Sequence, residues 1–297
     1  MHTMRSGRDG TVMRILAASF MVTTVGCAVT MMHAGATLSR VSPPGSPPIV
    51  AVTGVGGYGG GMSVTATGTV YGQTSGPLPG MSGHSLAAPM VGIAGGPTGT
   101  TSGSVQRGYY LVGADGGVFA FDGAPFYGSM GGKPLNAPIV GMTVTAGGYR
   151  LVAADGGVFD FGTAPFLGSM GGEPLNAPIV ATSGDSGGYY LVGADGGVFT
   201  FGTAVFRGSM AGHPLDAPVI GIDQVPHGYF LGAADGGVFT LGGCIPGTTD
   251  TCPYSIEPQS FKGQIDSPVV AISTHLSPAP VPSSVSPLVV TSSGRIY

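Results

Sequence analysis

A segment of 40 residues recurs four times in this sequence, and this period limits the folds that the chain can adopt. The strong copies share the start Gly-Tyr and the core Asp-Gly-Gly-Val-Phe, and they begin at Gly108, Gly148, Gly188 and Gly228. Weaker copies begin at Val64 and Val289, which brings the number of units to six. A fixed period of this length is typical of repeat architectures, because one small unit buries its apolar surface only by stacking on its neighbours.

Each unit divides into short apolar runs bounded by Gly, Pro and Asp. In the unit that contains Gly148 these runs span 138–144, 149–154, 158–161 and 164–169, and they are rich in Val, Ile, Tyr and Phe. Runs of this length and composition predict β-strands. The pair Asp155-Gly156 between the second and third runs predicts a tight hairpin turn with positive backbone angles. Four strands in 40 residues predict one blade of a β-propeller.

The sequence therefore predicts an all-β fold, a six-bladed β-propeller built from four-stranded 40-residue repeats over residues 48–297. The first strand of each blade is expected at 48–52, 89–93, 138–142, 178–182, 218–222 and 268–272. Gly and Ala alternate in these strands, which suits the crowded wall of a central channel. Because the chain ends in the third strand of the last blade, residues 38–41 are predicted to add its outer strand and close the ring.

The first 36 residues are predicted to be a signal peptide or a signal anchor. Three arginines precede an uncharged run from Ile15 to Met32, and the small residues Ala34-Gly35-Ala36 follow it. This order matches the basic, apolar and cleavage regions of an export signal. The 18-residue run is nearly long enough to span a bilayer, so a retained anchor is an alternative, and lipidation of Cys27 is another. We expect a secreted or cell-surface protein with an extracellular propeller that contacts the membrane only through this segment.

Residues 37–47 are predicted to be a Pro-rich linker, because the stretch VSPPGSPP favours extended polyproline II structure. Beyond the export signal the chain contains two cysteines, Cys244 and Cys252. In an oxidising compartment they are predicted to form a disulfide that closes a small loop. Two free thiols in a surface loop are the alternative.

The composition excludes several function classes. Charged residues make up only 8% of the chain and hydrophobic residues 42%, which argues against the amphipathic surface helices of an ordinary helical enzyme. With 10 basic and 14 acidic side chains the net charge is −4, and the sequence holds no basic patch that could neutralise a row of phosphates. Nucleic acid is therefore not an expected partner, and the sequence predicts no cofactor, no metal site and no catalytic residue.

The repeat resembles a family of tandem repeats in secreted actinobacterial proteins, whose consensus is G-Y-x-x-V-x-x-D-G-G-x-F-x-F-G-x-A-x-F-x-G-S. The resemblance covers residues 48–297 and is strongest over 108–243. It implies an extracellular propeller module without catalytic residues. Members of the family often carry Trp after the Tyr, whereas this chain has no Trp and places Tyr110, Arg150, Tyr190 and Phe230 there. A ligand-binding role of that aromatic in relatives would not carry over to Arg150.

Candidate binding residues are the positions that vary while the repeat frame stays fixed, because variable loops on a scaffold are where binding is usually placed. The loop before each first strand supplies His84, Lys133, Asn136, Glu173, Asn176, His213 and Asp216. In a propeller this loop and the Asp-Gly turn lie on one face, near the channel mouth. These side chains could hydrogen-bond hydroxyl or amide groups, so cell-wall polysaccharide or an envelope protein is the expected partner. A solvated loop with Asn or Asp capping before Pro is the alternative.

Three other patterns suggest chemistry. The equivalent aspartates Asp115, Asp155, Asp195 and Asp235 are interpreted as hairpin residues. The segment Gly184-Asp185-Ser186-Gly187-Gly188 spells a serine-protease motif, but it aligns with a plain turn between two strands and is interpreted as a loop. Asp185, Asp223, His227 and His275 align in such turns on the opposite face. A propeller hydrolase with acidic and histidine residues at the channel mouth is therefore the second hypothesis, and a purely structural extracellular spacer is the third.

Overall fold

The computed structural model describes residues 45–55, 60–72, 76–101, 104–225, 227–242, 255–256, 260–273, 284–285 and 288–297. The chain divides into two units, residues 1–36 and 37–297, and every described residue belongs to the second. The predicted export signal with Cys27, the expected strand at 38–41, Cys244, Cys252 and His275 lie outside the described residues. Within the described part, no helix has the length and apolarity of a membrane span.

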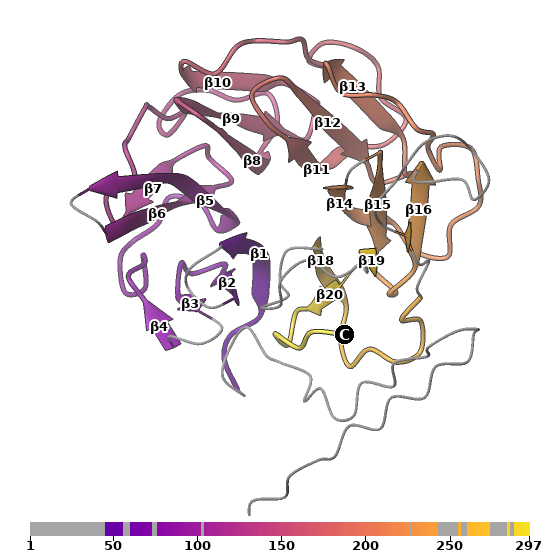
Figure 1. Cartoon of the computed structure of the whole chain (residues 1–297), viewed down its shortest axis with the longest axis horizontal. Coiled ribbons are helices and arrows are strands. Elements are labelled where there is room, and N and C mark those ends of the chain that lie inside the picture. The colour runs from indigo at the N-terminus through magenta and orange to yellow at the C-terminus, as the bar shows by residue number, and fades with distance from the viewer. Residues whose placement is uncertain are drawn as a thin grey trace, which may run out of the picture. The chain divides into compact units, whose positions relative to one another are not determined.

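The second unit is built from antiparallel sheets that follow one another along the chain (Figure 1). Blade 1 consists of β1 (Ile49–Val55), β2 (Gly60–Thr65), β3 (Val70–Gly72) and β4 (Gly76–Leu78). Blade 2 consists of β5 (Met90–Thr101), β6 (Ser104–Gly113) and β7 (Val118–Phe121), and blade 3 of β8 (Ile139–Thr145), β9 (Gly148–Ala153) and β10 (Val158–Gly162). Blade 4 consists of β11 (Ile179–Gly184), β12 (Gly188–Gly193) and β13 (Val198–Gly202), and blade 5 of β14 (Val219–Val225), β15 (Gly228–Ala233) and β16 (Val238–Gly242).

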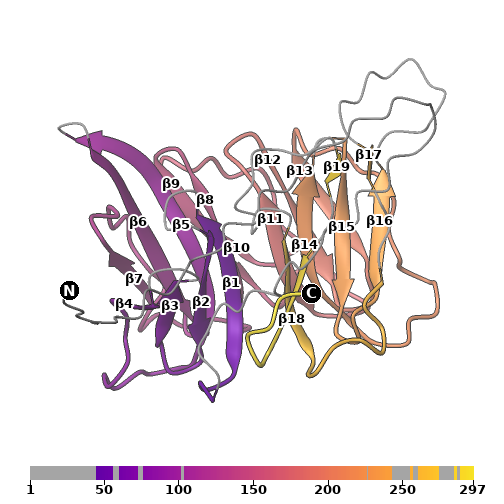
Figure 2. The same cartoon turned by 60° about the horizontal axis from the view of Figure 1, so that its bottom comes forward.

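Blade 6 pairs β18 (Val269–Ser273) with β20 (Leu288–Thr291), and a short parallel pair joins β17 (Ser255–Ile256) to β19 (Ser284–Val285). Each inner strand begins one residue after the start predicted from the sequence. Each inner strand also contacts the next one, and β18 contacts β1, beside which it lies in both views (Figures 1 and 2). The predicted all-β propeller with six blades is thereby confirmed in the described residues.

A belt of main-chain hydrogen bonds links each blade to the next. Ala154 N donates to Pro138 O within blade 3, and Ile179 N of blade 4 donates to Ala154 O, both at 2.9 Å. The same bond between blades recurs around the ring, and it closes the ring where Ile49 N of blade 1 donates to Ser292 O of blade 6 at 2.9 Å. The first inner strand therefore joins blade 1 to blade 6.

The Asp-Gly turns have a different backbone from the one predicted. Gly156 has a φ of 78°, but Asp155 is not among the described non-glycine residues with positive φ. Gly156 N donates to Ala153 O, and Ala153 N donates to Gly157 O. This pattern is typical of a three-residue loop, in which one left-handed glycine follows an ordinary turn and Asp needs no strained angle. The aspartate acts as a turn residue as predicted, because its Oδ1 accepts a hydrogen bond from the Gly two positions later in all four strong repeats.

The fourth run of the strong repeats was predicted to be a strand, and this prediction is wrong. Residues 164–169 follow β10 without strand pairing, and Met170 N then donates to Gly156 O at 3.0 Å. The next blade supplies the missing partner, because the Tyr189 hydroxyl of blade 4 donates to Gly168 O. Equivalent bonds run from Tyr149 to Gly128 O at 2.5 Å and from Tyr229 to Gly208 O at 2.6 Å. A tyrosine of the neighbouring blade thus takes the place of the predicted strand ladder.

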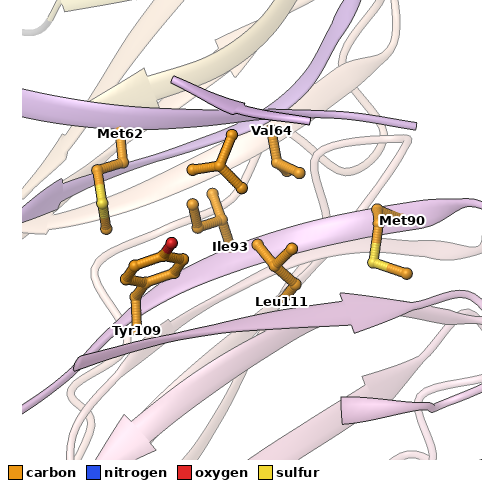
Figure 3. Close-up of a cluster of buried hydrophobic side chains, with 7 residues drawn as sticks. Met62, Val64, Met90, Ile93, Tyr109 and Leu111 are labelled. Atoms are coloured by element: carbon orange, nitrogen blue, oxygen red, sulfur yellow. The ribbon is translucent and has the colours of Figure 1, made fainter. Parts of the chain in front are cut away.

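The hydrophobic core is divided among the spaces between adjacent blades. Figure 3 shows one such cluster, in which Met62 and Val64 of blade 1 face Met90, Ile93 and Leu111 of blade 2. Further clusters fill the spaces between the other neighbouring blades, and the last one brings Val290 and Ile296 of blade 6 against Val52 of blade 1. Burying both faces of each sheet explains why its strands are apolar almost throughout.

Candidate functional site

The seven candidate residues lie exposed on one face of the propeller, which we call the Asp-Gly face. They are His84, Lys133, Asn136, Glu173, Asn176, His213 and Asp216. Ile139, at the start of β8, pairs with Ala153, at the end of β9, so the loop before the inner strand lies beside the Asp-Gly turn as expected. The backbone fixes the loops, since Lys133 N donates to Met130 O at 2.8 Å and the equivalent residues of the other loops do the same. The variable side chains project from this fixed backbone and are exposed.

The structure brings two of these candidates into one groove. Lys133 and Asn136 line a groove of about 440 Å³ together with Asp115, Leu135 and Ala87. The lining comes from the loop that leads into blade 2, from the Asp-Gly turn of blade 2 and from the loop that leads into blade 3. The groove offers an ammonium, an amide, a carboxylate and an apolar floor, and such a set can hydrogen-bond a polar ligand and also contact its apolar surface.

Asp216 is not a free candidate, because it takes part in an ion pair that the sequence did not indicate. Lys262 Nζ lies 2.7 Å from Asp216 Oδ2 and 3.0 Å from Asp235 Oδ2. Burial acts to raise the pKa of Asp235, but hydrogen bonds from Gly237 N and Lys262 outweigh it and hold this pKa below its usual value. Hydrogen bonds to the two carboxylates raise the pKa of Lys262. Lys262 thus links the loop that carries Asp216 to the turn that carries Asp235.

A second and larger depression lies on the opposite face, between blades 4 and 5. It has a volume of about 550 Å³, and its lining includes the side chains of Asp185, Asp223, Arg207 and His227. The sequence placed Asp185, Asp223 and His227 in equivalent turns on this face, and the structure shows that all three line one pocket. Arg207 and Tyr190 also line this pocket and were missed.

The protease-like motif in this region is a turn, as interpreted from the sequence. Asp185 Oδ1 accepts hydrogen bonds from Gly187 N at 2.7 Å and from Gly188 N at 3.2 Å. Ser186 Oγ accepts one from Ala146 N of blade 3 at 3.3 Å. In the equivalent turn of blade 5, His227 occupies the left-handed region with a φ of 69°. The described residues contain no group of three or more His, Cys, Asp or Glu that could hold a metal ion.

The position after the repeat tyrosine is structural, which the sequence did not indicate. Tyr110, Arg150, Tyr190 and Phe230 are all buried. The Tyr110 hydroxyl donates to Pro125 O at 2.8 Å, and Arg150 Nη2 donates to Pro165 O, the equivalent carbonyl in blade 3, at 3.1 Å. This position therefore anchors the outer segment of its own blade.

Arg150 adds contacts that a tyrosine at its position cannot make. Its Nε lies 3.1 Å from Asp160 Oδ1, and its Nη1 donates to Asp185 O of blade 4 at 2.8 Å. Its Cζ lies 4.3 Å from the centroid of the Tyr189 ring. Burial raises the pKa of Tyr189 to about 12, although the positive charge of Arg150 acts to lower it. Asp160 occurs only in the repeat that has Arg150, so the repeat alignment itself contained the signal for this pair.

Comparison with known proteins shows similarity in structure and not in sequence. No protein-family model matches the chain, and no curated protein sequence matches it. The WD40 β-propeller domain of Doa1 is 12% identical, with 88% of this chain and 97% of that chain covered and a TM-score of 0.52. The designed protein Ika8 is 13% identical, with 87% of this chain and 98% of that chain covered and a TM-score of 0.47. BBS1N, from a complex with ARL6DN, is also 13% identical, with 87% of this chain and 92% of that chain covered and a TM-score of 0.47. The likeness to the Doa1 domain, at 12% identity, shows the β-propeller fold alone.

Proposed function

We propose that this protein is an exported, non-catalytic binding module that attaches to cell-wall polysaccharide through its Asp-Gly face. Support comes from the groove of Lys133 and Asn136, which combines charged, amide and apolar groups beside loops that differ from repeat to repeat. The frame of the repeat supplies the scaffold, and its exposed loops supply the variation that recognition requires. The predicted export signal and the resemblance to repeats of secreted actinobacterial proteins support an extracellular ligand.

The test is co-sedimentation of the full chain, in mild detergent, with purified bacterial cell walls and with insoluble polysaccharides. We expect the chain to sediment with wall material, and we expect Lys133→Ala combined with Asn136→Ala to weaken this binding by about tenfold. The matched control is Glu173→Ala combined with Asn176→Ala, which changes the equivalent exposed loop of the next repeat outside the groove.

Each result has a distinct meaning. A loss confined to the Lys133 and Asn136 variant supports the groove as the site, and an equal loss in both variants supports recognition by the whole Asp-Gly face. A chain that sediments with no wall material contradicts the polysaccharide proposal. A pull-down from the envelope fraction then tests the envelope protein, which is the alternative partner.

A further inference from the structure

The pocket lies at the boundary between blades 4 and 5, and the preceding boundary, between blades 3 and 4, already holds a guanidinium group. At the boundary between blades 3 and 4, the Arg150 guanidinium donates to Pro165 O in its own blade and to Asp185 O in the next blade. It also lies over the Tyr189 ring, which comes from the next blade as well. This space between two blades is therefore built to hold a guanidinium group.

The repeat places the counterparts of these residues around the pocket. Forty residues later, Tyr190 stands in the place of Arg150, Val205 in the place of Pro165 and Val225 in the place of Asp185, and all three line the pocket. A tyrosine hydroxyl carries a single proton, and that of Tyr190 is directed to Val205 O at 3.4 Å. It cannot serve both carbonyl positions as Arg150 does one blade earlier.

The charges of the pocket favour a cation. Asp185 and Asp223 supply two carboxylates, and Arg207 supplies one positive charge. Together these three side chains have one excess negative charge. Asp185 accepts its two backbone hydrogen bonds through Oδ1, and a carboxylate offers about four acceptor positions in all. A planar guanidinium can engage such a carboxylate with two parallel hydrogen bonds.

We propose that this pocket binds the arginine side chain of a partner polypeptide. The partner's guanidinium would lie between the turns of blades 4 and 5, pair with the carboxylates of Asp185 and Asp223, and donate to main-chain carbonyl groups as Arg150 does within the chain. The pocket is separate from the groove of the proposed function, because the two sites lie at opposite ends of the inner strands. Either proposal can therefore fail without the other.

The test is isothermal titration of the full chain with the peptide acetyl-Gly-Arg-Gly-amide at low ionic strength. The control ligand is the same peptide with citrulline, which keeps the shape of arginine and removes its charge. We expect the arginine peptide to bind at least tenfold more tightly than the citrulline peptide, and we expect Asp223→Asn to remove most of this difference.

A second variant fills the pocket with the pair of side chains that blade 3 carries. Tyr190→Arg combined with Thr200→Asp copies the Arg150 and Asp160 pair into blade 4, and it should abolish binding. The matched control is Tyr110→Arg combined with Ala120→Asp, which inserts the same pair into blade 2 and leaves the pocket intact. Far-ultraviolet circular dichroism establishes that both variants fold, and Asp223→Asn decides the question if either does not. Equal binding of the two peptides, or unchanged binding after Asp223→Asn, would overturn the proposal.

Discussion

Replacing Asp160 by threonine tests the buried ion pair of blade 3 in isolation. Arg150 is fully buried, and an arginine cannot lose its charge by deprotonation in a protein. Removing Asp160 leaves that charge without its carboxylate, and breaking a buried pair in this way typically costs about 3–5 kcal/mol of unfolding free energy. Threonine is chosen because it stands at the equivalent position of blade 4.

The double variant Arg150→Tyr with Asp160→Thr recreates the Tyr190 and Thr200 combination of blade 4 and should behave differently. Replacing a whole buried pair is often neutral or stabilising by about 1–4 kcal/mol. Asp160 Oδ2 supports this expectation, because it is a buried atom for which the described structure provides no hydrogen-bond partner. The double variant should therefore be at least as stable as the unchanged protein.

The pH dependence of the single variant Arg150→Tyr follows from Asp160. Burial raises the pKa of Asp160, although the hydrogen bond and charge of Arg150 act to lower it. Without Arg150 this pKa rises further, and the folded state disfavours the ionised carboxyl. A group whose pKa is higher in the folded state contributes most at low pH, so this variant should regain stability as the pH falls from 7 towards 4.

The measurement is urea unfolding followed by tyrosine fluorescence and by far-ultraviolet circular dichroism. Coincident curves from the two signals establish that a single free energy of unfolding describes each variant. A loss below about 1 kcal/mol for Asp160→Thr, or a double variant as unstable as Asp160→Thr alone, would refute the reasoning, because both values derive from the cost of an unpaired buried charge.

Three further predictions concern the turns and the contacts between blades. Gly156→Ala should cost about 2–5 kcal/mol in urea unfolding, because an added Cβ would lie 2.5 Å from Met170 Cβ and the φ is 78°. Gly172→Ala is its control, with a φ of 86° and open space, and should cost only about 1–2 kcal/mol; equal losses would contradict the argument from crowding. Tyr229→Phe should cost about 1–3 kcal/mol, because Gly208 O and Arg207 N lose their hydroxyl partner, and an unchanged urea midpoint would show that the bond between blades is dispensable. Burial acts to raise the pKa of Asp266, but hydrogen bonds from Ser293, Thr291 and Ser267 hold this pKa below its usual value. The stability that Asp266 contributes is therefore lost as the pH drops below about 4. Acid titrations of Asp266→Asn should show a shallower fall in stability than those of the unchanged protein.

The sequence by itself determined the fold and the positions of the inner strands. The 40-residue period sets the unit of structure, and proline and glycine mark the strand ends so clearly that each inner strand begins within one residue of its predicted start. The aspartate of each turn was also correctly assigned from its place before glycine. These features depend on contacts within a few residues of the chain, and such local contacts can be predicted from the residue types at neighbouring positions.

Only the tertiary structure decided what happens between blades. The run 164–169 reads as a strand, yet its carbonyl groups bond to Tyr189 and Arg150 and not to a neighbouring strand. The sequence left the role of the Arg150 position open, and the structure shows that this side chain is fully buried. Asp185 and His227 meet in one pocket although 42 positions separate them in the chain. Contacts between blades depend on how two sheets are set against each other, and no local pattern in the sequence encodes that angle.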